Sequence, residues 1–318
     1  MVRNEFTFPS ADGKTAIHAA EWLPETAPRA VLVLSHGVSE HILRYEPFAA
    51  FLTERGFAVC GHDHLGHGTS VAEGAPRLYF GPRGSWDDVV RDLYARRELA
   101  GKRFPGVPVF LLGHSMGSFL ARTYLIRYPG TVAGAILMGT GQMVPAVLAA
   151  ARVLAAEEAR RVGEDHASPL VTKLAFETYN RRFAPNRTAF DWLAANEESV
   201  DRYIADPLCG GDTTTGLFRE MLSGIACVTK QENLRKMNLN TPVLFISGED
   251  DPVGDMGKGV RRAYAAFRRA GVRDAELKLY PGLRHEILNE ESRETVYRDI
   301  LSWLERHLPL PGGAGERP

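Results

Sequence analysis

Short apolar runs recur along the chain, and segments with helical spacing of apolar residues separate them. Val, Ile, Leu and Phe fill these runs almost continuously, which is typical of strands buried on both faces of a parallel sheet. The runs cover residues 30–35, 57–60, 107–113, 133–139, 241–248 and 276–280. Two further segments, 4–9 and 16–22, flank a turn at Ala11-Asp-Gly-Lys and predict an antiparallel hairpin that opens the sheet.

Helices are expected between the runs, at residues 45–55, 85–103, 116–128, 253–270 and 291–307. Alternating strands and helices predict an α/β fold with a mostly parallel sheet and helices on both of its faces.

One long stretch, from about residue 142 to residue 228, carries helical patterns but no buried strand. The apolar face of its first helix is expected to contain Met143, Val147, Ala151 and Leu154. Further helices are expected around Leu170, Leu174 and Tyr179, at residues 190–195 and at residues 216–227.

This pattern predicts three parts of the chain. Residues 1–141 and 229–307 form the core, residues 142–228 form a helical cap inserted between two late strands, and residues 308–318, rich in Pro and Gly, form a flexible tail. A helical subdomain that only thickens the core is the alternative interpretation of residues 142–228.

Charge and composition exclude several classes of protein. The 318 residues contain 38 Lys and Arg against 39 Asp and Glu, a net charge of −1, so nucleic-acid binding is not expected. Three scattered cysteines argue against a disulfide framework, and the N-terminal residues lack the apolar segment of a secretory signal. The most apolar stretch, 143–151, is too short to span a bilayer. A cytoplasmic protein is therefore expected, and its oligomeric state stays open.

The segment Gly113-His-Ser-Met-Gly117 fits the pattern G-x-S-x-G, and it lies between a predicted buried strand and a predicted helix. A nucleophile elbow needs this strand–turn–helix setting, because the tight turn tolerates only small neighbours and lifts the serine hydroxyl above the sheet. Ser115 is therefore the candidate nucleophile. A Gly-rich turn with a serine helix cap is the structural alternative.

A serine nucleophile needs a histidine base, which a carboxylate must orient. Of the histidines after Ser115, His285 alone follows a predicted strand and precedes the last helix, whereas His166 lies in the predicted cap and His307 ends a helix. The carboxyl edge of the sheet is where the base must lie. For the acid, the cluster Glu249, Asp250 and Asp251 offers three candidates that the chemistry alone does not separate.

An oxyanion hole needs two backbone N–H groups aimed at the developing charge. The residue after the nucleophile, Met116, supplies one, and the loop after the 30–35 strand is placed to supply the other from Val38.

A rival interpretation concerns His62-Asp-His-Leu-Gly-His67, which crowds imidazoles as metal sites do. In the metallo-β-lactamase motif H-x-H-x-D-H the aspartate is the fifth residue, whereas here it is the second. The sequence also offers no further histidine cluster that would complete a two-metal site. A tight Gly-rich turn is the favoured interpretation, and we expect neither a metal nor an organic cofactor.

An ordered set of motifs resembles the monoacylglycerol lipase and lysophospholipase branch of the α/β-hydrolase superfamily. The matching segments are HGVSEHILRYEPFA (36–49), GHDHLGHGTS (61–70), LLGHSMGSFLAR (111–122), FDWLAANEESVDRYIADPLCG (190–210), GEDDPVG (248–254) and YPGLRHEILNE (280–290). The resemblance covers nearly the whole chain. It implies the α/β-hydrolase fold and serine hydrolysis more specifically than it implies a substrate.

The resemblance assigns roles to individual residues. It places the nucleophile on Ser115, the base on His285 and the acid on Asp251, with Asp250 second, and the oxyanion donors on Val38 and Met116. It also places Glu40 and Arg44 near a glycerol-like head group.

These roles imply hydrolysis of lipid-like carboxylic esters through an acyl-enzyme. The apolar cap suggests an acyl tunnel, with Leu154 a candidate contact, and transient contact with a membrane surface. Three alternatives stay open: a short-chain carboxylesterase, a serine aminopeptidase with an acidic cluster in the cap at Glu157, Glu158, Glu197 and Glu198, and a binding protein without turnover.

Overall fold

The computed structural model describes residues 1–82, 85–173 and 178–308 and contains an eight-stranded sheet with strand order β1-β2-β4-β3-β5-β6-β7-β8. β1 pairs with β2 and β2 with β4 in antiparallel fashion, and the other neighbours are parallel. The strands are β1 (Val2–Pro9), β2 (Ala16–Leu23), β3 (Ala30–Ser35), β4 (Phe57–His62), β5 (Val109–His114), β6 (Gly134–Met138), β7 (Val243–Gly248) and β8 (Ala275–Tyr280). The expected hairpin and all six strands expected after it are therefore present, although β8 lies at the edge of the sheet and is only half-buried.

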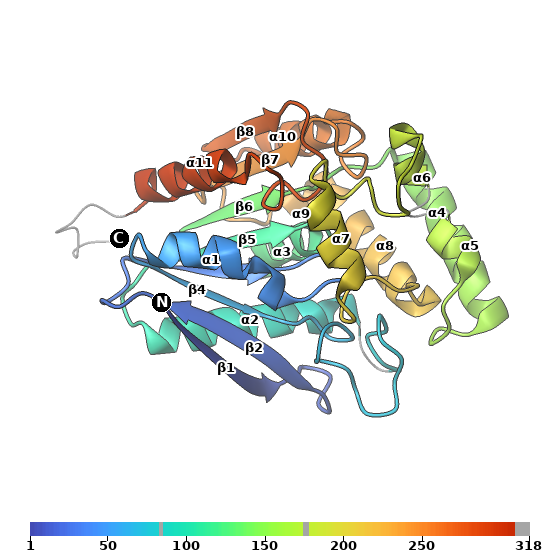
Figure 1. Cartoon of the computed structure of the whole chain (residues 1–318), viewed down its shortest axis with the longest axis horizontal. Coiled ribbons are helices and arrows are strands. Elements are labelled where there is room, and N and C mark those ends of the chain that lie inside the picture. The colour runs from blue at the N-terminus through green and yellow to red at the C-terminus, as the bar shows by residue number, and fades with distance from the viewer. Residues whose placement is uncertain (83–84, 174–177, 309–318) are drawn as a thin grey trace.

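Helices cover both faces of the sheet (Figure 1). Val31 and Val33 of β3 belong to one hydrophobic cluster, and Leu32 and Leu34 belong to the other, so successive side chains of one strand fill opposite layers. This double burial explains why the inner strands are continuously apolar. One layer contains α1 (Glu46–Thr53) and α11 (Arg293–Arg306), and the other contains α2 (Trp86–Arg103), α3 (Met116–Arg127) and α10 (Lys258–Ala270).

The start of α10 lies later than the sequence pattern predicts. Asp255, Met256 and Gly257 have positive φ angles of 53°, 51° and 79°. Left-handed residues cannot continue a right-handed helix, so α10 begins only at Lys258 and not at residue 253.

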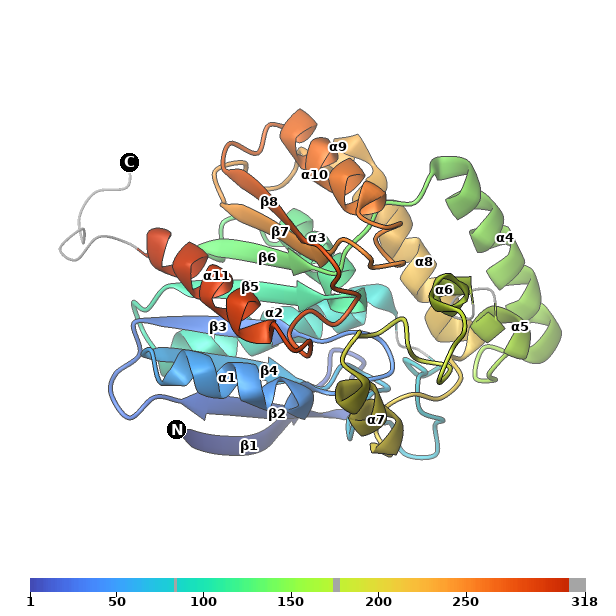
Figure 2. The same ribbon diagram turned by 45° about the horizontal axis from the view of Figure 1, so that its top comes forward.

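The segment between β6 and β7 is helical. The β-structure in its described residues is limited to one isolated bridge between Ala167 and Thr214. Figures 1 and 2 show α4, α5 and α6 beyond one end of the sheet, on the side away from the N-terminus. The elements are α4 (Pro145–Val162), α5 (Pro169–Thr172), α6 (Thr178–Asn180), the 3-10 helix η3 (Arg181–Phe183), α7 (Glu197–Ala205), α8 (Thr215–Thr229) and α9 (Gln231–Leu234). The short 3-10 helix η1 (Ile42–Tyr45) precedes α1.

The apolar face predicted for α4 is half right, because Met143 and Ala151 pack against the core, whereas Val147 and Leu154 do not. Leu148, Ala155 and Ala159 are buried, whereas Leu154 is 41% exposed and Val147 is 55% exposed. Residues 148, 155 and 159 share one helix face, and Leu154 lies about 100° away from Ala155 around the axis. Packing of α4 on α8 therefore uses a face that includes Ala151 but is rotated away from Leu154.

The helix predicted at residues 190–195 is also wrong, because these residues form turns. The N–H of Trp192 donates to the side chain of Asn180 at 3.0 Å, and the N–H of Ala195 donates to Glu290 at 3.0 Å. Side chains thus take the hydrogen bonds that a helix would need. The helix expected around Leu170 and Tyr179 is split between α5 and α6, and Leu174 and the expected tail from residue 309 lie outside the described residues.

Arg122 of α3 holds the two ends of the helical segment against the core. Its buried guanidinium donates to the carbonyl oxygens of Gly141 at 2.8 Å and Val228 at 3.0 Å, and to the side-chain oxygen of Gln142 at 3.2 Å. Burial lowers the pKa of Arg122 to about 9, so the group remains charged at neutral pH. One buried cation therefore ties the entry and the exit of the segment to the same helix.

No helix in the described part of the chain is both long and apolar enough to cross a membrane.

Candidate active site

Ser115 lies in a sharp turn between β5 and α3. Its backbone has φ 53° and ψ −121°, a strained conformation for a non-glycine residue, and its N–H donates to the carbonyl of Met138 at 3.0 Å. A Cβ on Gly113 would lie 2.2 Å from the Gly117 carbonyl oxygen, and a Cβ on Gly117 would lie 2.0 Å from the Ser35 carbonyl oxygen. The flanking glycines are therefore required by close backbone packing, as the nucleophile-elbow interpretation predicts.

His285 lies in the loop between β8 and α11 and faces Asp251. Its Nδ1 is 3.0 Å from both carboxylate oxygens of Asp251. Both side chains are buried, whereas Glu249 is exposed and Asp250 is half-buried. Of the three acids that the sequence left open, the fold brings Asp251 to the histidine.

Asp251 is held as a carboxylate at the end of β7. Burial alone would raise its pKa, but the attraction and hydrogen bond of His285, the N–H of Val253 and the hydroxyl of Ser247 outweigh that effect and lower the pKa. The Val253 N–H donates at 2.9 Å and the Ser247 hydroxyl at 3.0 Å. The ionised carboxylate fixes a proton on Nδ1 of His285 and leaves Nε2 as the acceptor.

The same pair shifts the imidazole in the opposite direction. Burial of His285 lowers its pKa, but the negative charge of Asp251 and its hydrogen bond, assisted by Glu286 and Glu40, raise the pKa above its ordinary value. His285 is therefore a stronger base than a free imidazole.

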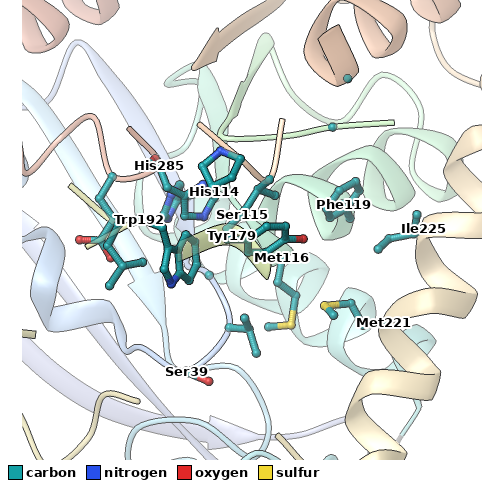
Figure 3. A pocket seen from close by; sticks show the side chains of 18 of the residues that line it. Ser39, His114, Ser115, Met116, Phe119, Tyr179, Trp192, Met221, Ile225 and His285 are labelled. Carbon is teal, nitrogen blue, oxygen red and sulfur yellow. The ribbon is translucent and has the colours of Figure 1, made fainter. Parts of the chain in front are cut away.

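Ser115 and His285 line the same cavity and lie near each other in Figure 3. Within the described residues no hydrogen bond joins the Ser115 hydroxyl to the imidazole. Catalytic hydrogen bonds of unliganded enzymes commonly tighten only when substrate is bound.

The start of α3 and the loop of Val38 both lie next to Ser115. Met116 is the first residue of α3, so its N–H has no acceptor within the helix. The loop that carries Val38 packs directly on the serine, because a Cβ on Gly37 would lie 3.1 Å from the Ser115 Cβ. Val38 itself lines the cavity.

Glu40 fixes this loop from behind. Its carboxylate accepts hydrogen bonds from the Gly37 N–H at 2.6 Å and the Tyr45 hydroxyl at 2.9 Å, and it lies 3.1 Å from His114 Nδ1. Burial opposes its charge, but Arg44 and the histidine keep the pKa of Glu40 well below its usual range. The loop that presents Val38 is therefore anchored to a buried carboxylate.

Arg44 bridges Glu40 to Glu286, the residue that follows the histidine. Its guanidinium donates to Glu40 at 2.6 Å and to both carboxylate oxygens of Glu286 at 2.8 and 2.7 Å. Glu286 and Trp192, whose ring lies 5.2 Å from that of His285, were missed in the sequence analysis. The position of Glu286 directly after the candidate base is the signal that would have pointed to it.

The cavity in front of Ser115 has a volume of about 520 Å³ and two chemically different ends. His285, His114 and Trp192 lie at one end, and Phe119, Met221 and Ile225 lie at the other, with Ser115 and Met116 between them (Figure 3). Glu40 lines the cavity, whereas Arg44 does not. The exposed Leu154 is not among the described lining residues either. The expectation of substrate contact by Leu154 therefore finds no support in its position.

Two histidines of residues 62–67, His64 and His67, form hydrogen bonds within neighbouring turns, and His67 Nδ1 lies 3.1 Å from the Leu65 carbonyl oxygen. His64 Nε2 lies 3.0 Å from the Ser35 hydroxyl, and the His64 N–H donates to His36 Nε2 at 2.9 Å. Burial lowers the pKa of both His62 and His67 to about 3. In the described ranges, the side-chain groups close enough together to hold a metal ion are His41, Asp206 and Cys209, and Asp274, Glu276 and His307. Neither group lines the cavity.

Comparisons with known proteins agree with this geometry. The family described as serine aminopeptidase, S33 (Hydrolase_4) matches residues 26–292. The monoacylglycerol lipase of Mycolicibacterium smegmatis is 30% identical over 311 residues, which cover 96% of this chain and 98% of that protein. Human monoglyceride lipase is 31% identical over 309 residues, which cover 96% of this chain and 91% of that protein.

The fold is also that of solved hydrolases. A highly thermostable carboxyl esterase from Bacillus coagulans, crystallised in complex with glycerol, superimposes with a TM-score of 0.90 at 26% identity and covers 97% of this chain and 100% of its own. An open-form lipase superimposes with a TM-score of 0.87 at 27% identity, over 96% of this chain and 99% of its own. The chain therefore belongs to the serine aminopeptidase S33 family of α/β-hydrolases together with the monoacylglycerol lipases, which confirms the fold class and the resemblance inferred from its sequence.

Proposed function

We propose that the protein hydrolyses fatty-acid esters of small alcohols, foremost monoacylglycerols, through an acyl-enzyme on Ser115. One observation carries this proposal: the same cavity is lined by a strained serine and by a histidine that is hydrogen-bonded to a carboxylate, and it has an apolar end. The ester-cleaving relatives of similar length support the same chemistry.

Each step has a group in place. The Ser115 hydroxyl attacks the acyl carbonyl while His285 Nε2 takes its proton, and Asp251 stabilises the imidazolium that forms. The N–H groups of Val38 and Met116 stabilise the oxyanion. His285 then returns the proton to the leaving alcohol, and a water molecule, activated by the same imidazole, releases the fatty acid from the serine.

The four acidic residues that the sequence offers for an aminopeptidase lie away from the cavity. Glu157, Glu197 and Glu198 are exposed, Glu158 pairs with Arg161, and none of them is among the described residues that line the cavity. We therefore favour ester substrates.

We further propose that residues 142–228 act as a cap over an acyl tunnel, within a core made of residues 1–141 and 229–307. A cytoplasmic location is part of the proposal, because the three cysteines are free thiols.

Replacement of the nucleophile tests the proposed function directly. Ser115→Ala should lose ester hydrolysis by several orders of magnitude and should no longer react covalently with a fluorophosphonate probe, while its circular dichroism and melting temperature stay close to those of the wild type. Labelling of the variant at the wild-type rate would show that another residue is the nucleophile.

The raised pKa of His285 predicts the pH profile. The imidazole must be neutral to accept the serine proton, so kcat/KM should fall as the pH drops through the raised pKa, with a single ionisation above 6.5. Rates measured between about pH 5 and pH 9 test this expectation. A midpoint at or below the ordinary histidine value would contradict it, and loss of activity in EDTA would return attention to His62, His64 and His67.

The apolar end of the cavity predicts a dependence on acyl length. Each buried methylene contributes about 0.8 kcal/mol, so two more carbons should raise kcat/KM roughly tenfold until the tunnel is full. Met221→Gln places a polar group of similar length in the tunnel and should flatten this rise, while hydrolysis of acetyl esters, the internal control, changes little. A wild-type preference for acetyl or propionyl esters would instead indicate a short-chain carboxylesterase.

Contact with a lipid surface is proposed for the outer side of α4. Val144, Val147 and Val153 are exposed there, and the first two also line the cavity, so the apolar surface continues into the site. Val153→Asp should weaken co-sedimentation with phosphatidylcholine vesicles. The matched control is Val2→Asp, which places the same charge on exposed β1, far from the cap, and equal binding of both variants would reject the contact.

A further inference from the structure

The end of the cavity that contains His285 is acidic. The acidic residues that line the cavity in the described part of the chain are Glu40, Asp212, Asp255 and Glu286, and the arginine that lines it is Arg262. Arg262 pairs with Asp255 at 3.0 Å, so this pair contributes no net charge. The carboxylates of Glu40 and Glu286, both buried, lie with the catalytic histidine.

Arg44 neutralises only one of these two buried charges. Its guanidinium donates to Glu40 and to both oxygens of Glu286, and one face of it rests on the Tyr203 ring at 4.9 Å. Arg44 is not among the residues that line the cavity. Seen from the cavity, the cation is therefore screened by its own carboxylate partners, and the group of Glu40, Arg44 and Glu286 presents a net negative charge.

The leaving alcohol must occupy this acidic end. His285 has to deliver a proton to the oxygen of the leaving alcohol, so the alcohol lies beside the imidazole, and the acyl chain takes the apolar end at Phe119 and Ile225 (Figure 3). The ring of Trp192 lies 5.2 Å from that of His285 and lines the same end of the cavity. Carboxylates next to an indole ring favour a cation over an anion, because both attract positive charge.

We propose that this alcohol subsite accepts neutral and cationic alcohols and rejects anionic ones, and that Glu286 determines the preference. Fatty esters of quaternary ammonium alcohols such as choline are therefore substrates, and lysophospholipids whose leaving alcohol carries a phosphate are poor ones. The proposal rests on the proposed function, because it uses the same serine and histidine.

The reaction on such an ester is balanced without another reactant. The bond between the acyl carbon and the choline oxygen breaks, the acyl group passes to the Ser115 oxygen, and the proton taken from Ser115 goes through His285 to the choline oxygen. Water then attacks the acyl-enzyme and releases the carboxylic acid. One proton of this water passes through the same imidazole to the Ser115 oxygen and restores the hydroxyl.

Three esters of one acyl chain test the preference. Octanoylcholine, 1-octanoylglycerol and 1-octanoylglycerol 3-phosphate differ in the charge of the alcohol, and each is used below its critical micelle concentration so that surface charge plays no part. The wild-type kcat/KM for the choline and glycerol esters should exceed that for the phosphate ester by roughly tenfold or more, since a unit charge a few ångströms from a partly buried charge is worth that factor. Equal values, or a preference for the phosphate ester, would overturn the proposal.

Variants of Glu286 assign the preference to that residue. Glu286→Gln keeps the size of the side chain, and Arg44 keeps its partner Glu40, so the ratio of choline ester to phosphate ester should fall by about tenfold. Glu286→Asp retains the charge and should retain most of the ratio. Glu25→Gln, at an 88% exposed side chain, is the matched control for the same change of net charge and should leave the ratio unchanged.

A second measurement separates charge from structural damage. Because Glu286 also helps to raise the pKa of His285, the acid limb of the pH profile should move to lower pH in Glu286→Gln but not in Glu286→Asp. An unchanged substrate ratio in a folded Glu286→Gln variant would refute the role of this residue. Failure of the wild type on both the glycerol and the choline ester would instead reject the proposed function itself.

Discussion

The tight backbone packing around Ser115 is the constraint on which the rest of the site depends. The serine holds φ at 53°, a conformation that costs of the order of 1–3 kcal/mol and survives only where the surroundings enforce it. Gly113 and Gly117 let the first turn of α3 approach β5 and the end of β3 closely enough to do so. The loop of Val38 also packs on the serine through Gly37, and Met116 is the first residue of α3. The strained turn and the proposed oxyanion donors thus belong to one packing arrangement.

Buried charges then give this arrangement its electrostatic character. Asp251 orients His285. The bridge from Glu40 through Arg44 to Glu286 connects the loop after β3, which packs on the serine, to the loop that carries the histidine. Each ion is costly to bury alone, so the partners hold one another in place. The bridge gives the end of the cavity that contains His285 a negative character that the apolar end at Phe119 and Ile225 lacks.

Much of this protein was determined by local patterns in the sequence. The inner strands were predicted because burial on both sheet faces demands continuous apolar residues, as Val31 to Leu34 show. Ser115 and His285 could be singled out as candidates because a nucleophile elbow and a base at the carboxyl edge need a fixed order of strand, turn and helix. These features depend on neighbours in the chain or on strand order, both of which a sequence records.

Other features were decided only by the tertiary structure. Asp251 differs from Asp250 by which carboxylate the β7 turn directs inward, and Leu154 faces outward because α8 packs on the other side of α4. The placement of Glu286 depends on Arg44, 242 positions away in the chain. The turn at Trp192 depends on hydrogen bonds that its backbone N–H groups donate to the side chains of Asn180 and Glu290. A helix can carry apolar residues around much of its surface, so packing and not spacing decides which face is buried. The net charge that lines a cavity depends on which charged side chains pair there, and this pairing also follows from packing.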